Sequence, residues 1–361
     1  MVKTYKYINT LQENYNLADK RVIIWGKSIS ALNLYVELKS RNVEVIGFTD
    51  SFTKQSQQFA GLPLYPFEQA IKIPNTVFYI ATFAYQYRIE ILELLEGKDI
   101  PVLCKGNVYG PGRYDTCRMK KKIENNREKI DLVKSILKDE KSKKTFEYLL
   151  EYRISNNHQL LMKAYEDGHK QYFPEQDIFK PSENEIFIDA GAYNGATSVE
   201  FSEWVGAKYE KIFLMEPDEL MKNIAREYMK LKDMKNIEII GKGAYSKNTI
   251  VNFKNLAESG SSHIEETGNS KIETISIDEM LQGNPVTYIK MDIEGAELPA
   301  LIGAEKTILS CKPKLAISIY HNEDDLWNIP YYIYQKYPWY QLFIRHYTKI
   351  TTETILYAVT Q

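Results

Sequence analysis

Cysteines and long apolar runs are both scarce in this sequence of 361 residues. The three cysteines show no C-x-x-C spacing, which argues against a zinc module or a disulfide framework and fits a reducing compartment. The longest apolar-rich run, residues 76–85, is about half as long as a membrane-spanning helix. The first six residues contain no apolar core of the kind that a signal peptide carries. We therefore expect a soluble cytoplasmic protein with no membrane span.

The sequence also lacks an excess of either charge. Its 46 basic and 48 acidic residues leave a formal net charge of −2. Recognition of nucleic acid or of an anionic membrane usually needs a basic surface, so neither is expected as a partner. The 27 tyrosines suit the recognition of sugars or proteins, although they also serve as ordinary amphipathic cover. The partner expected from this composition is a small-molecule or glycan substrate.

The first third of the chain alternates predicted strands and helices but lacks a complete dinucleotide fingerprint. A strand over residues 22–25 ends at Gly26, and the turn that follows reads G-x-S-x-x-A in place of G-x-G-x-x-G. Asp50, at the end of the next strand, lies where a ribose-binding acid would stand. Residues 1–112 are therefore predicted to form a small Rossmann-like α/β domain. It either binds a nucleotide or nucleotide-sugar or is a structural or dimerising module, which would make the chain a homo-oligomer.

Residues 113–180 are strongly helical and charged in character. Apolar residues recur at helical spacing from Ile123 to Leu137 and again from Phe146 to Tyr165. We expect two or three helices that link two domains and cap the second one. A chain of this length suggests two domains, and the second is expected over residues 181–361.

The second domain is organised around one strand and a glycine turn. Residues 186–188 form a short apolar strand that ends at Asp189, and the turn D-x-G-x-x-x-G leads into a helix. Glycine lets the backbone approach a ligand, and a helix N-terminus presents unpaired N–H groups. The carboxylate before the turn would repel a pyrophosphate but would suit the ammonium group of S-adenosylmethionine. The alternative interpretation of this stretch is a strand-to-helix turn that binds no ligand. The candidate cofactor residues in this turn are Asp189, Gly191, Ala192, Tyr193, Asn194 and Gly195.

Two later turns lie at the same predicted edge of the sheet. Glu216 follows a strand at residues 211–215, where an acid takes both ribose hydroxyls of a nucleoside. Gly243 and Ala244 form a small-residue turn after the next strand, against which an adenine could lie. These three residues belong to the predicted cofactor site, which Asp292, after the next strand of the sheet, completes.

Acidic residues gather after the fourth predicted strand of this domain. Asp292, Glu294 and Glu297 lie within six residues of each other, where they repel one another unless they hold a cation, a proton or hydrogen-bond donors. Helix capping explains part of this cluster but not Asp292. His321 follows the fifth strand, titrates near neutrality and could take a proton from a hydroxyl. Asp292, Glu294 and His321 are the candidate catalytic residues. No metal is expected, because no complete set of metal ligands is visible in the sequence. A divalent ion held by Asp292 and Glu294 is a minor variant of this prediction.

The chain ends with two predicted strands at residues 341–345 and 354–359, which are close enough in sequence to pair antiparallel. A mostly parallel sheet closed by a late antiparallel hairpin is the layout of class I methyltransferases and differs from that of a dehydrogenase. The predicted fold class is therefore α/β: a class I methyltransferase Rossmann-like fold, preceded by a smaller Rossmann-like α/β domain and a helical linker.

Four motifs together resemble the FkbM family of S-adenosylmethionine-dependent methyltransferases. They are Asp-Ala-Gly-Ala-x-x-Gly at 189–195, Met-Glu-Pro at 215–217, Lys-Met-Asp-Ile-Glu-Gly-Ala-Glu at 290–297 and Ile-Ser-Ile-Tyr-His at 317–321. The resemblance covers roughly residues 180–360 and implies a Rossmann-like methyltransferase that transfers methyl groups to oxygen, often on sugars, glycans or polyketides. It does not extend to the N-terminal domain, so it does not identify the acceptor.

As a hypothesis, the reaction is an in-line displacement at a sulfonium, in which the protein aligns the nucleophile and removes its proton. The glycine turn would hold the methionyl part of the cofactor, and Glu216 would hold the ribose. Asp292 would lie nearest the methyl group, and either His321 or Asp292 would accept the proton. Glu294 and Glu297 would orient the substrate or the loop that carries them.

Two other interpretations of the chain stay open. An NAD-dependent nucleotide-sugar dehydrogenase or epimerase would use one of the Rossmann-like domains, but the sequence lacks a full G-x-G-x-x-G and a suitably placed Tyr-x-x-x-Lys pair. A non-catalytic nucleotide-binding scaffold would have no use for the repulsion within the acidic cluster. Sequence alone does not decide the acceptor, the oligomeric state or the role of the N-terminal domain.

Overall fold

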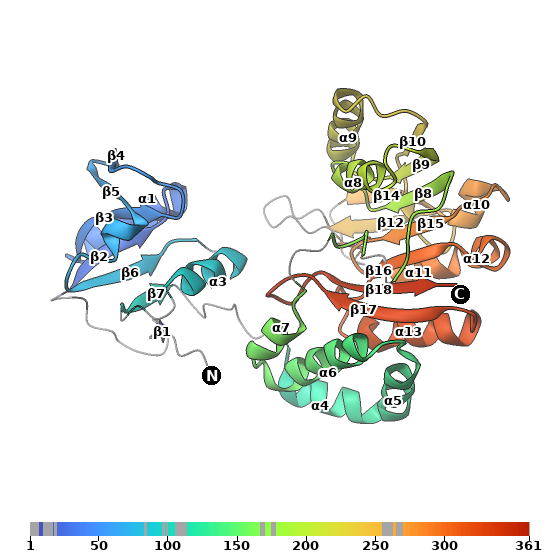
Figure 1. Ribbon diagram of the computed structural model, residues 1–361, viewed down its shortest axis with the longest axis horizontal. Coiled ribbons are helices and arrows are strands. Elements are labelled where there is room, and N and C mark those ends of the chain that lie inside the picture. The colour runs from blue at the N-terminus through green and yellow to red at the C-terminus, as the bar shows by residue number, and fades with distance from the viewer. Residues whose placement is uncertain are drawn as a thin grey trace. The chain divides into compact units, whose positions relative to one another are not determined.

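The structure is a computed structural model that describes residues 7–9, 17, 20–82, 85–95, 98, 100–104, 114–166, 170–174, 178–254, 263–264 and 270–360. The chain divides into two compact units, residues 1–115 and residues 116–361. Figure 1 shows that each unit combines a β-sheet with helices.

The first unit contains a seven-stranded sheet with the strand order β1-β7-β6-β2-β3-β5-β4, in which β4 alone runs antiparallel to its neighbour. Its strands are β1 (Tyr7–Asn9), β2 (Arg21–Trp25), β3 (Glu44–Asp50), β4 (Gln57–Phe59), β5 (Leu62–Pro66), β6 (Thr76–Ile80) and β7 (Val102–Cys104). Its described helices are α1 (Ile29–Ser40), α2 (Phe67–Ala70) and α3 (Tyr85–Leu94). Parallel strands joined by helical crossovers make this unit Rossmann-like.

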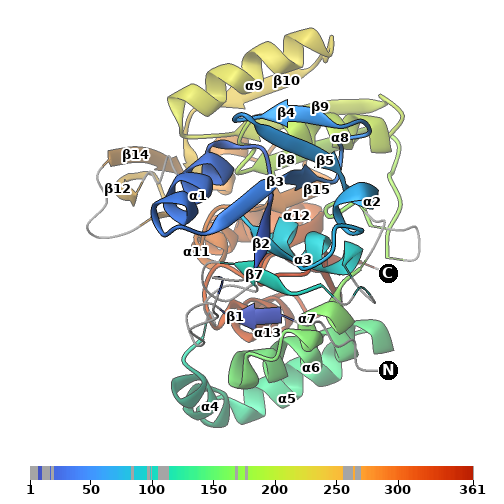
Figure 2. The ribbon, with the colours of Figure 1, turned by 90° about the vertical axis from the view of Figure 1, so that its left-hand side faces the viewer.

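Alternate residues of β2 point to opposite faces of this sheet. Val22 and Ile24 belong to one apolar cluster with residues of α1, whereas Ile23 and Trp25 belong to another with residues of α2 and α3. Figure 2 shows α1 on one side of the strands and α2 with α3 on the other. Burial on both faces explains why this strand reads as a continuous apolar run.

The turn after β2 contains the weak nucleotide motif. Gly26 has a φ of +126°, in the region that favours glycine. Asp50 is buried at the end of β3, and its Oδ2 lies 2.9 Å from Nζ of Lys27. Its Oδ1 accepts the backbone N–H groups of Phe52 and Thr53. Protein groups therefore engage the carboxylate that was expected to face a ribose.

The second unit contains a seven-stranded sheet with the order β10-β9-β8-β15-β16-β18-β17. The first five strands in this order are parallel, and β18 is antiparallel to both of its neighbours. The strands are β8 (Glu185–Ala190), β9 (Tyr209–Met215), β10 (Ile237–Ile240), β15 (Tyr288–Met291), β16 (Lys314–Ser318), β17 (Gln341–His346) and β18 (Thr354–Val359). The predicted parallel sheet with a late antiparallel hairpin is confirmed, and with it the fold class.

Helices cover both faces of this sheet (Figure 1). Phe201 of α8 (Ala196–Trp204) stacks on Phe187 of β8, with ring centroids 4.2 Å apart. Residues of α8 and α9 (Glu219–Leu231) share a second apolar cluster with Leu214 of β9. The later helices are α10 (Ile277–Leu281), α11 (Glu297–Ile302), α12 (Glu305–Cys311) and α13 (Asp325–Lys336). With the strands parallel, the carboxyl ends of β8, β9, β15 and β16 meet at one edge of the sheet.

A second, smaller sheet in this unit was not predicted from the sequence. Its order is β11-β14-β12-β13, and β12 pairs antiparallel with β14. The strands are β11 (Gly243–Ala244), β12 (Thr249–Lys254), β13 (His263–Ile264) and β14 (Ser270–Ile275).

Helices α4 (Thr116–Asn125), α5 (Arg127–Ile136), α6 (Glu140–Ser155) and α7 (Gln159–Ala164) precede the seven-stranded sheet of this unit in the chain. Among them, α6 lies against its edge strand, β17. The N–H of Ile344 donates to Oγ of Ser142 at 2.9 Å, and the carbonyl oxygen of Leu342 accepts an N–H from the residue after Leu137. Arg345 adds an ion pair with Asp139, with Nη2 2.7 Å from Oδ2. These contacts occupy an edge that could otherwise pair with another strand.

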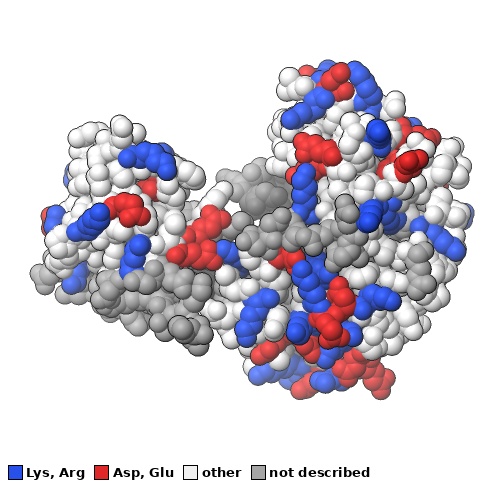
Figure 3. Space-filling model, in the orientation of Figure 1, with Lys and Arg blue, Asp and Glu red and all other residues white. Residues whose placement is uncertain are grey.

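Charged side chains of both signs are interspersed on the face of the second unit that Figure 3 shows. Opposite charges also pair between α4 and the segment before α13, because Nζ of Lys122 lies 3.6 Å from Glu323 and 3.3 Å from Asp324. Within the described part of the chain, none of the helices is long and apolar enough to cross a membrane.

A buried ion pair lies at the centre of the main sheet of the second unit. Asp189 of β8 and Lys290 of β15 are register partners on neighbouring strands, and Nζ lies 3.0 Å from Oδ1. Their side chains are 0% and 2% exposed. Nζ also donates to the carbonyl oxygen of Gly191 at 2.6 Å, and Oγ of Ser198 donates to the other oxygen of Asp189 at 2.8 Å. Loss of either partner would leave an unpaired buried charge.

Replacing Lys290 by methionine should therefore destabilise the second unit strongly. Removing one partner of a buried ion pair typically costs about 3–5 kcal/mol of unfolding free energy, because the other charge stays buried. Differential scanning calorimetry of Lys290→Met and of the double variant Lys290→Met/Asp189→Asn measures this cost, and the double variant should lose less. As a control, Lys211→Met removes an exposed lysine of β9 that pairs with Glu238, at a cost of at most about 1 kcal/mol. Equal losses in the two single variants would contradict this account.

Two buried histidines lie near the contact between α7 and β17. His346 is 0% exposed, and its Nδ1 lies 2.8 Å from Oγ1 of Thr354. Burial lowers the pKa of His346 to about 3. Burial also lowers the pKa of His158, to about 4. Both rings are therefore neutral in the folded protein at neutral pH.

These shifts predict a loss of stability in mild acid. Below pH 6.5 the unfolded chain gains a proton at His346 that the folded protein does not take up until about pH 3, so the free energy of unfolding falls with the pH. Between about pH 6.5 and 5, one such histidine costs roughly 2 kcal/mol. Thermal melts of the wild type and of His346→Gln across this range test the effect, and the variant should lose less stability. Parallel curves for the two proteins would show that His346 is not responsible.

Candidate active site

The carboxyl ends of four neighbouring strands bring the predicted site residues together. β8 leads into the glycine turn, β9 into Glu216, β15 into Asp292, and β16 ends shortly before His321. β8 and β15 are adjacent in the sheet although they are far apart in the chain. A Cβ atom added to Gly191 would lie 1.8 Å from the carbonyl oxygen of Asp292. Only glycine therefore allows these two turns to touch.

The glycine turn is held closely against the end of β9. The N–H groups of Gly191 and Ala192 both donate to the carbonyl oxygen of Met215, at 3.1 Å each. Oδ1 of Asn194 accepts the N–H of Ala196 at 3.1 Å, which caps the start of α8. Tyr193 is half-exposed, in contrast to Ala192, which is 2% exposed. The predicted turn residues therefore form a compact loop between β8 and α8.

Asp189 does not have the position expected of it. We predicted that its carboxylate contacts the ammonium group of a cofactor. The side chain is instead 0% exposed, forms an ion pair with Lys290 and accepts a hydrogen bond from Ser198. Asp189 projects from the same face of the sheet as Lys290, its register partner on β15, so the two side chains meet there. Asp189 therefore supports the turn from below. Its direct contact with a ligand stays a prediction, which the burial of this side chain disfavours.

Glu216 connects the glycine turn to the start of α9. Its Oε2 accepts the N–H of Tyr193, and its Oε1 accepts the N–H of Asp218, both at 2.8 Å. The residue is 7% exposed, and burial raises its pKa to about 7 although these hydrogen bonds oppose the shift. Asp218 caps α9 by accepting the N–H of Met221.

Gly243 and Ala244 form β11 at the same end of the domain. A Cβ atom added to Gly243 would lie 3.9 Å from Pro217, so the turn is close to the segment that carries Glu216. Ala244 is 3% exposed. Gly243 is thus near the other predicted cofactor residues, whereas the side chain of Ala244 packs inside the protein.

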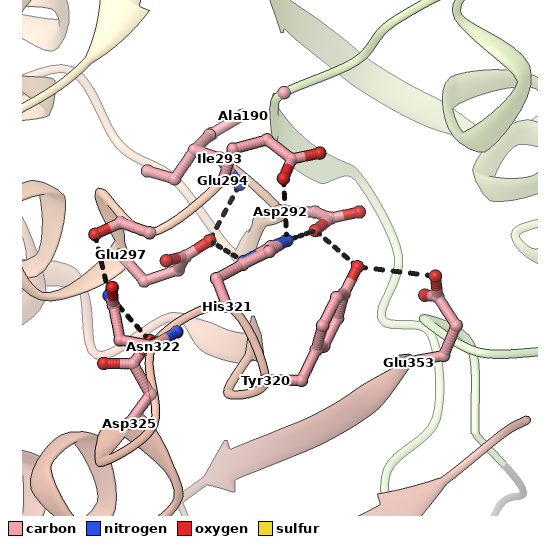
Figure 4. A network of polar contacts seen from close by, with 12 residues as sticks. Ala190, Asp292, Ile293, Glu294, Glu297, Tyr320, His321, Asn322, Asp325 and Glu353 are labelled. Atoms are coloured by element: carbon pink, nitrogen blue, oxygen red, sulfur yellow. Dashed lines mark hydrogen bonds and ion pairs between the residues drawn. The ribbon is translucent and has the colours of Figure 1, made fainter. Parts of the chain in front are cut away.

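His321 lies among three carboxylates (Figure 4). Its Nδ1 is 2.8 Å from Oε1 of Glu297, and its Nε2 is 3.4 Å from Oδ1 of Asp292 and 3.3 Å from Oε2 of Glu294. Glu297 is 0% exposed, and its Oε1 also accepts the N–H of Ile293. The structure therefore brings Asp292, Glu294 and His321 together, as the predicted catalytic group requires.

Two tyrosines hold the carboxylate of Asp292. The hydroxyl of Tyr172 donates to Oδ2 at 2.8 Å, and that of Tyr320 donates to Oδ1 at 3.1 Å. Burial alone would raise the pKa of Asp292, but the charges of Lys290 and His321 outweigh it and hold the pKa below its usual range. Asp292 is therefore ionised at neutral pH.

The pKa values of Glu294, Glu353 and His321 shift in the opposite direction. Burial raises the pKa of Glu294 to about 7 and that of Glu353 to about 7. Burial by itself lowers the pKa of His321, but Glu297, Asp292 and Glu294 raise it to about 9. The imidazole is therefore charged near neutral pH, which is unfavourable for its predicted role as proton acceptor.

Sequence reasoning did not assign Tyr320 or Glu353 to the site. Besides its bond to Asp292, the hydroxyl of Tyr320 donates to Oε1 of Glu353 at 3.4 Å (Figure 4). Tyr320 directly precedes His321, so its position was an available signal. Glu353 lies in the turn between β17 and β18 with a φ of +62°, and no local pattern marks it. Tyr172, which precedes β8 in the chain, contacts the site through Asp292.

Comparison with known proteins relates the second unit to methyltransferases in sequence and fold. Residues 189–349 match the family model of the methyltransferase FkbM domain. The crystal structure of methyltransferase FkbM from Methylobacillus flagellatus KT is similar in fold, with a TM-score of 0.61 and 23% identity over 94% of this chain and 90% of that chain. An rRNA methylase from Streptococcus thermophilus has a TM-score of 0.34 and 16% identity, over 58% of this chain and 95% of that chain. No curated protein matches the sequence significantly.

The family match starts at Asp189 and ends in the turn between β17 and β18. It includes the glycine turn, Glu216 and the group of residues around His321. The strand order of the surrounding sheet is that of the class I methyltransferase fold. Residues 189–349 therefore match the FkbM methyltransferase family in sequence and lie within a sheet that has the class I methyltransferase strand order.

Proposed function

We propose that the protein is an S-adenosylmethionine-dependent methyltransferase that methylates a hydroxyl of a sugar, a glycan or a related small molecule. The observation that supports this most is the contact between the glycine turn and the acidic cluster. An added Cβ at Gly191 would lie 1.8 Å from the backbone of Asp292. A donor held by the turn and an acceptor held by the cluster would be neighbours in this arrangement.

The charge of the site suits a cationic cofactor. S-adenosylmethionine carries a sulfonium and an ammonium group, whereas NAD carries a pyrophosphate that an acidic site repels. The acidic side chains of the site outnumber the basic ones. They are Asp189, Glu216, Asp292, Glu294, Glu297 and Glu353, against Lys290 and His321.

Glu216 is the residue that we assign to the ribose. Each of its oxygens accepts one backbone N–H, from Tyr193 and from Asp218. A carboxylate has about four acceptor positions, so about two are left for hydroxyl donors. Two donated hydrogen bonds would also favour the ionised form of this buried acid. The backbone of residues 191–195, in place of Asp189, would hold the methionyl part.

The cofactor, when bound, supplies a methyl group that is already activated on sulfur. The protein then has to align the acceptor hydroxyl and take its proton. Glu294 and Asp292 are the most accessible groups of the cluster, with side chains 35% and 26% exposed against 9% for His321. We therefore assign the proton to one of these carboxylates and infer that His321 holds both of them in place.

A neutral acceptor fits this site better than an anionic one, because a phosphate or carboxylate beside the reacting hydroxyl would be repelled by the cluster. A hydroxyl-rich sugar or glycan meets that condition. A cytoplasmic location and a homo-oligomer formed through the first unit stay predictions from the sequence.

Replacing Glu216 by alanine should weaken cofactor binding. Hydrogen bonds to a charged group contribute about 1.5–3 kcal/mol, so the dissociation constant of S-adenosylmethionine should rise roughly 10- to 100-fold. Calorimetric titrations with S-adenosylmethionine, its demethylated product and NAD, each added separately, measure this. Glu219→Ala is the matched control, because Glu219 is an exposed acid in the first turn of α9. Binding of NAD alone would refute the proposed function.

His321→Ala should separate binding from turnover. His321 contacts the cluster and not the glycine turn, so we expect S-adenosylmethionine to bind within about threefold of its wild-type affinity. Turnover should fall by about a hundredfold or more, as is usual when a group that supports proton transfer is lost. The measurement is release of demethylated cofactor in the presence of glycan and nucleotide-sugar acceptors. Unchanged turnover would remove His321 from the chemistry.

A further inference from the structure

Helix α9 presents an apolar ridge to solvent. The ridge consists of Leu220, Ile224 and Leu231, whose exposed fractions are 64%, 42% and 83%. We propose that a second copy of this chain covers the ridge, in a dimer whose two α9 helices pack antiparallel across a two-fold axis. The inference goes beyond the proposed function, because association of two chains can be measured without cofactor or acceptor.

The ridge lies on a different side of α9 from the residues that pack on the sheet. Its members follow one another by four and by seven positions, spacings that keep side chains on one side of an α-helix. Ala225 and Met229 are 0% and 5% exposed and share an apolar cluster with residues of α8 and β9. At about 100° of rotation per residue, the ridge is turned from these two residues by roughly 140°. It therefore faces away from the packed side of the helix.

The exposure of this ridge is unusual for a monomer. Single apolar side chains are common on protein surfaces, whereas neighbouring ones mark interaction sites. Within the described part of the chain, Leu231 has the largest exposed fraction of any large apolar side chain. Tyr228, which lies between Ile224 and Leu231 along the helix, is also partly exposed. The ridge is therefore a continuous apolar strip along α9.

An open sheet edge lies beside the ridge. β10 is the terminal strand of the main sheet, and among the described residues it pairs with β9 alone. Ile237 and Ile239 of β10 pack against the same apolar cluster as Ala225 of α9. Figures 1 and 2 both show α9 and β10 at one end of the second unit. Proteins usually cover such edges, as α6 covers β17 at the opposite end, and a second copy on the ridge would approach the edge of β10.

The charges along α9 match those of a second α9 in the opposite direction. Glu219 and Lys230 are both exposed and lie eleven positions apart, the same spacing as that between Leu220 and Leu231. Eleven residues make about three turns, so the members of each pair lie on one line along the helix. A two-fold axis across the middle of α9 would bring Leu220 of either copy onto Leu231 of the other. The same axis would bring Glu219 of either copy beside Lys230 of the other.

The parallel orientation is disfavoured. It would place Glu219 beside Glu219 and Lys230 beside Lys230, and it would align the two helix dipoles unfavourably. Within one chain, Glu219 and Lys230 pair with Lys222 and Glu227 of their own helix. Such surface pairs contribute little, so their exchange for pairs between copies costs little. This self-complementary pattern is the reason to assign the ridge to a second copy of the chain.

The first test is sedimentation velocity of the full chain over a range of concentrations, without cofactor. We expect a reversible dimer. Leu231→Asp should raise the dimer dissociation constant by about a hundredfold or more, because the contact would then bury an unpaired charge. Leu309→Asp is the matched control. Leu309 is a leucine of α12 that is 49% exposed, and this change should alter the dissociation constant by no more than about threefold.

Crosslinking tests the orientation of the helices. Under mild oxidation, the double variant Leu220→Cys/Leu231→Cys should form a disulfide between these two positions, which mass spectrometry of the peptides identifies. The two positions lie about 16 Å apart on one helix, beyond the reach of a disulfide, so any such bond joins two chains. Each single variant should show no more crosslinked dimer than the wild type, which controls for the native cysteines.

Each of three results would overturn the proposal. They are a monomer at every concentration, a dimer that Leu231→Asp leaves intact, and a dimer in which only the single cysteine variants crosslink. If Leu231→Asp misfolds, the crosslinking of the double variant decides the question. The proposed function is tested separately, because failure to bind S-adenosylmethionine would refute that function and leave the dimer standing.

Discussion

The buried ion pair between Asp189 and Lys290 is the interaction on which the rest of the site depends. Burial alone would lower the pKa of Lys290, but Asp189 and Asp292 outweigh burial and raise it, so the ammonium group stays charged. Its Nζ also donates to the carbonyl oxygens of Ala190 and Gly191. One cation thus neutralises the acid at the end of β8, stabilises the acid after β15 and fixes the start of the glycine turn.

The other acidic side chains of the site differ in how well positively charged groups and hydrogen-bond donors compensate their charge. Glu297 has the ring of His321 and a backbone N–H as partners. Glu216, Glu294 and Glu353 are less well compensated, since burial raises the pKa of each to about 7. A site with three such acids gains stability from any ligand that brings positive charge or hydrogen-bond donors. This is the physical reason why a cationic cofactor and a hydroxyl acceptor would both suit the same edge of the sheet.

The sequence predicted which residues meet better than it predicted how they are oriented. Parallel strands deliver their carboxyl ends to one edge, so the order of motifs along the chain was sufficient to gather Glu216, Asp292 and His321. The direction of Asp189 was not predictable in the same way, because it depends on Lys290 being its register partner on another strand. The pKa of His321 likewise depends on three carboxylates whose distances only the folded chain defines.

Features that arise from pairing between distant segments were not predictable from local patterns. Glu353 reaches Tyr320 because β18 inserts between β16 and β17, which places the β17–β18 turn beside the site. The pairing of β12 with β14 joins two short segments of mixed polarity, without the sustained alternation that marks a strand. The edge strand β17 is covered by helices that the sequence placed only as a linker or cap.

Contact between turns also couples the glycine turn after β8 to the acidic cluster after β15. The turn after β8 touches the turn after β15 at Gly191 and Asp292, with no room for a side chain between them. Two hydrogen bonds also join the turn after β15 to the segment after β16. One links Glu297 to His321, and the other links Gly295 to Asn322. Because each contact involves backbone or a buried side chain, displacement of one turn must displace the next. A ligand that orders the glycine turn would therefore also position the cluster to which we assign the acceptor, without any large movement of the sheet.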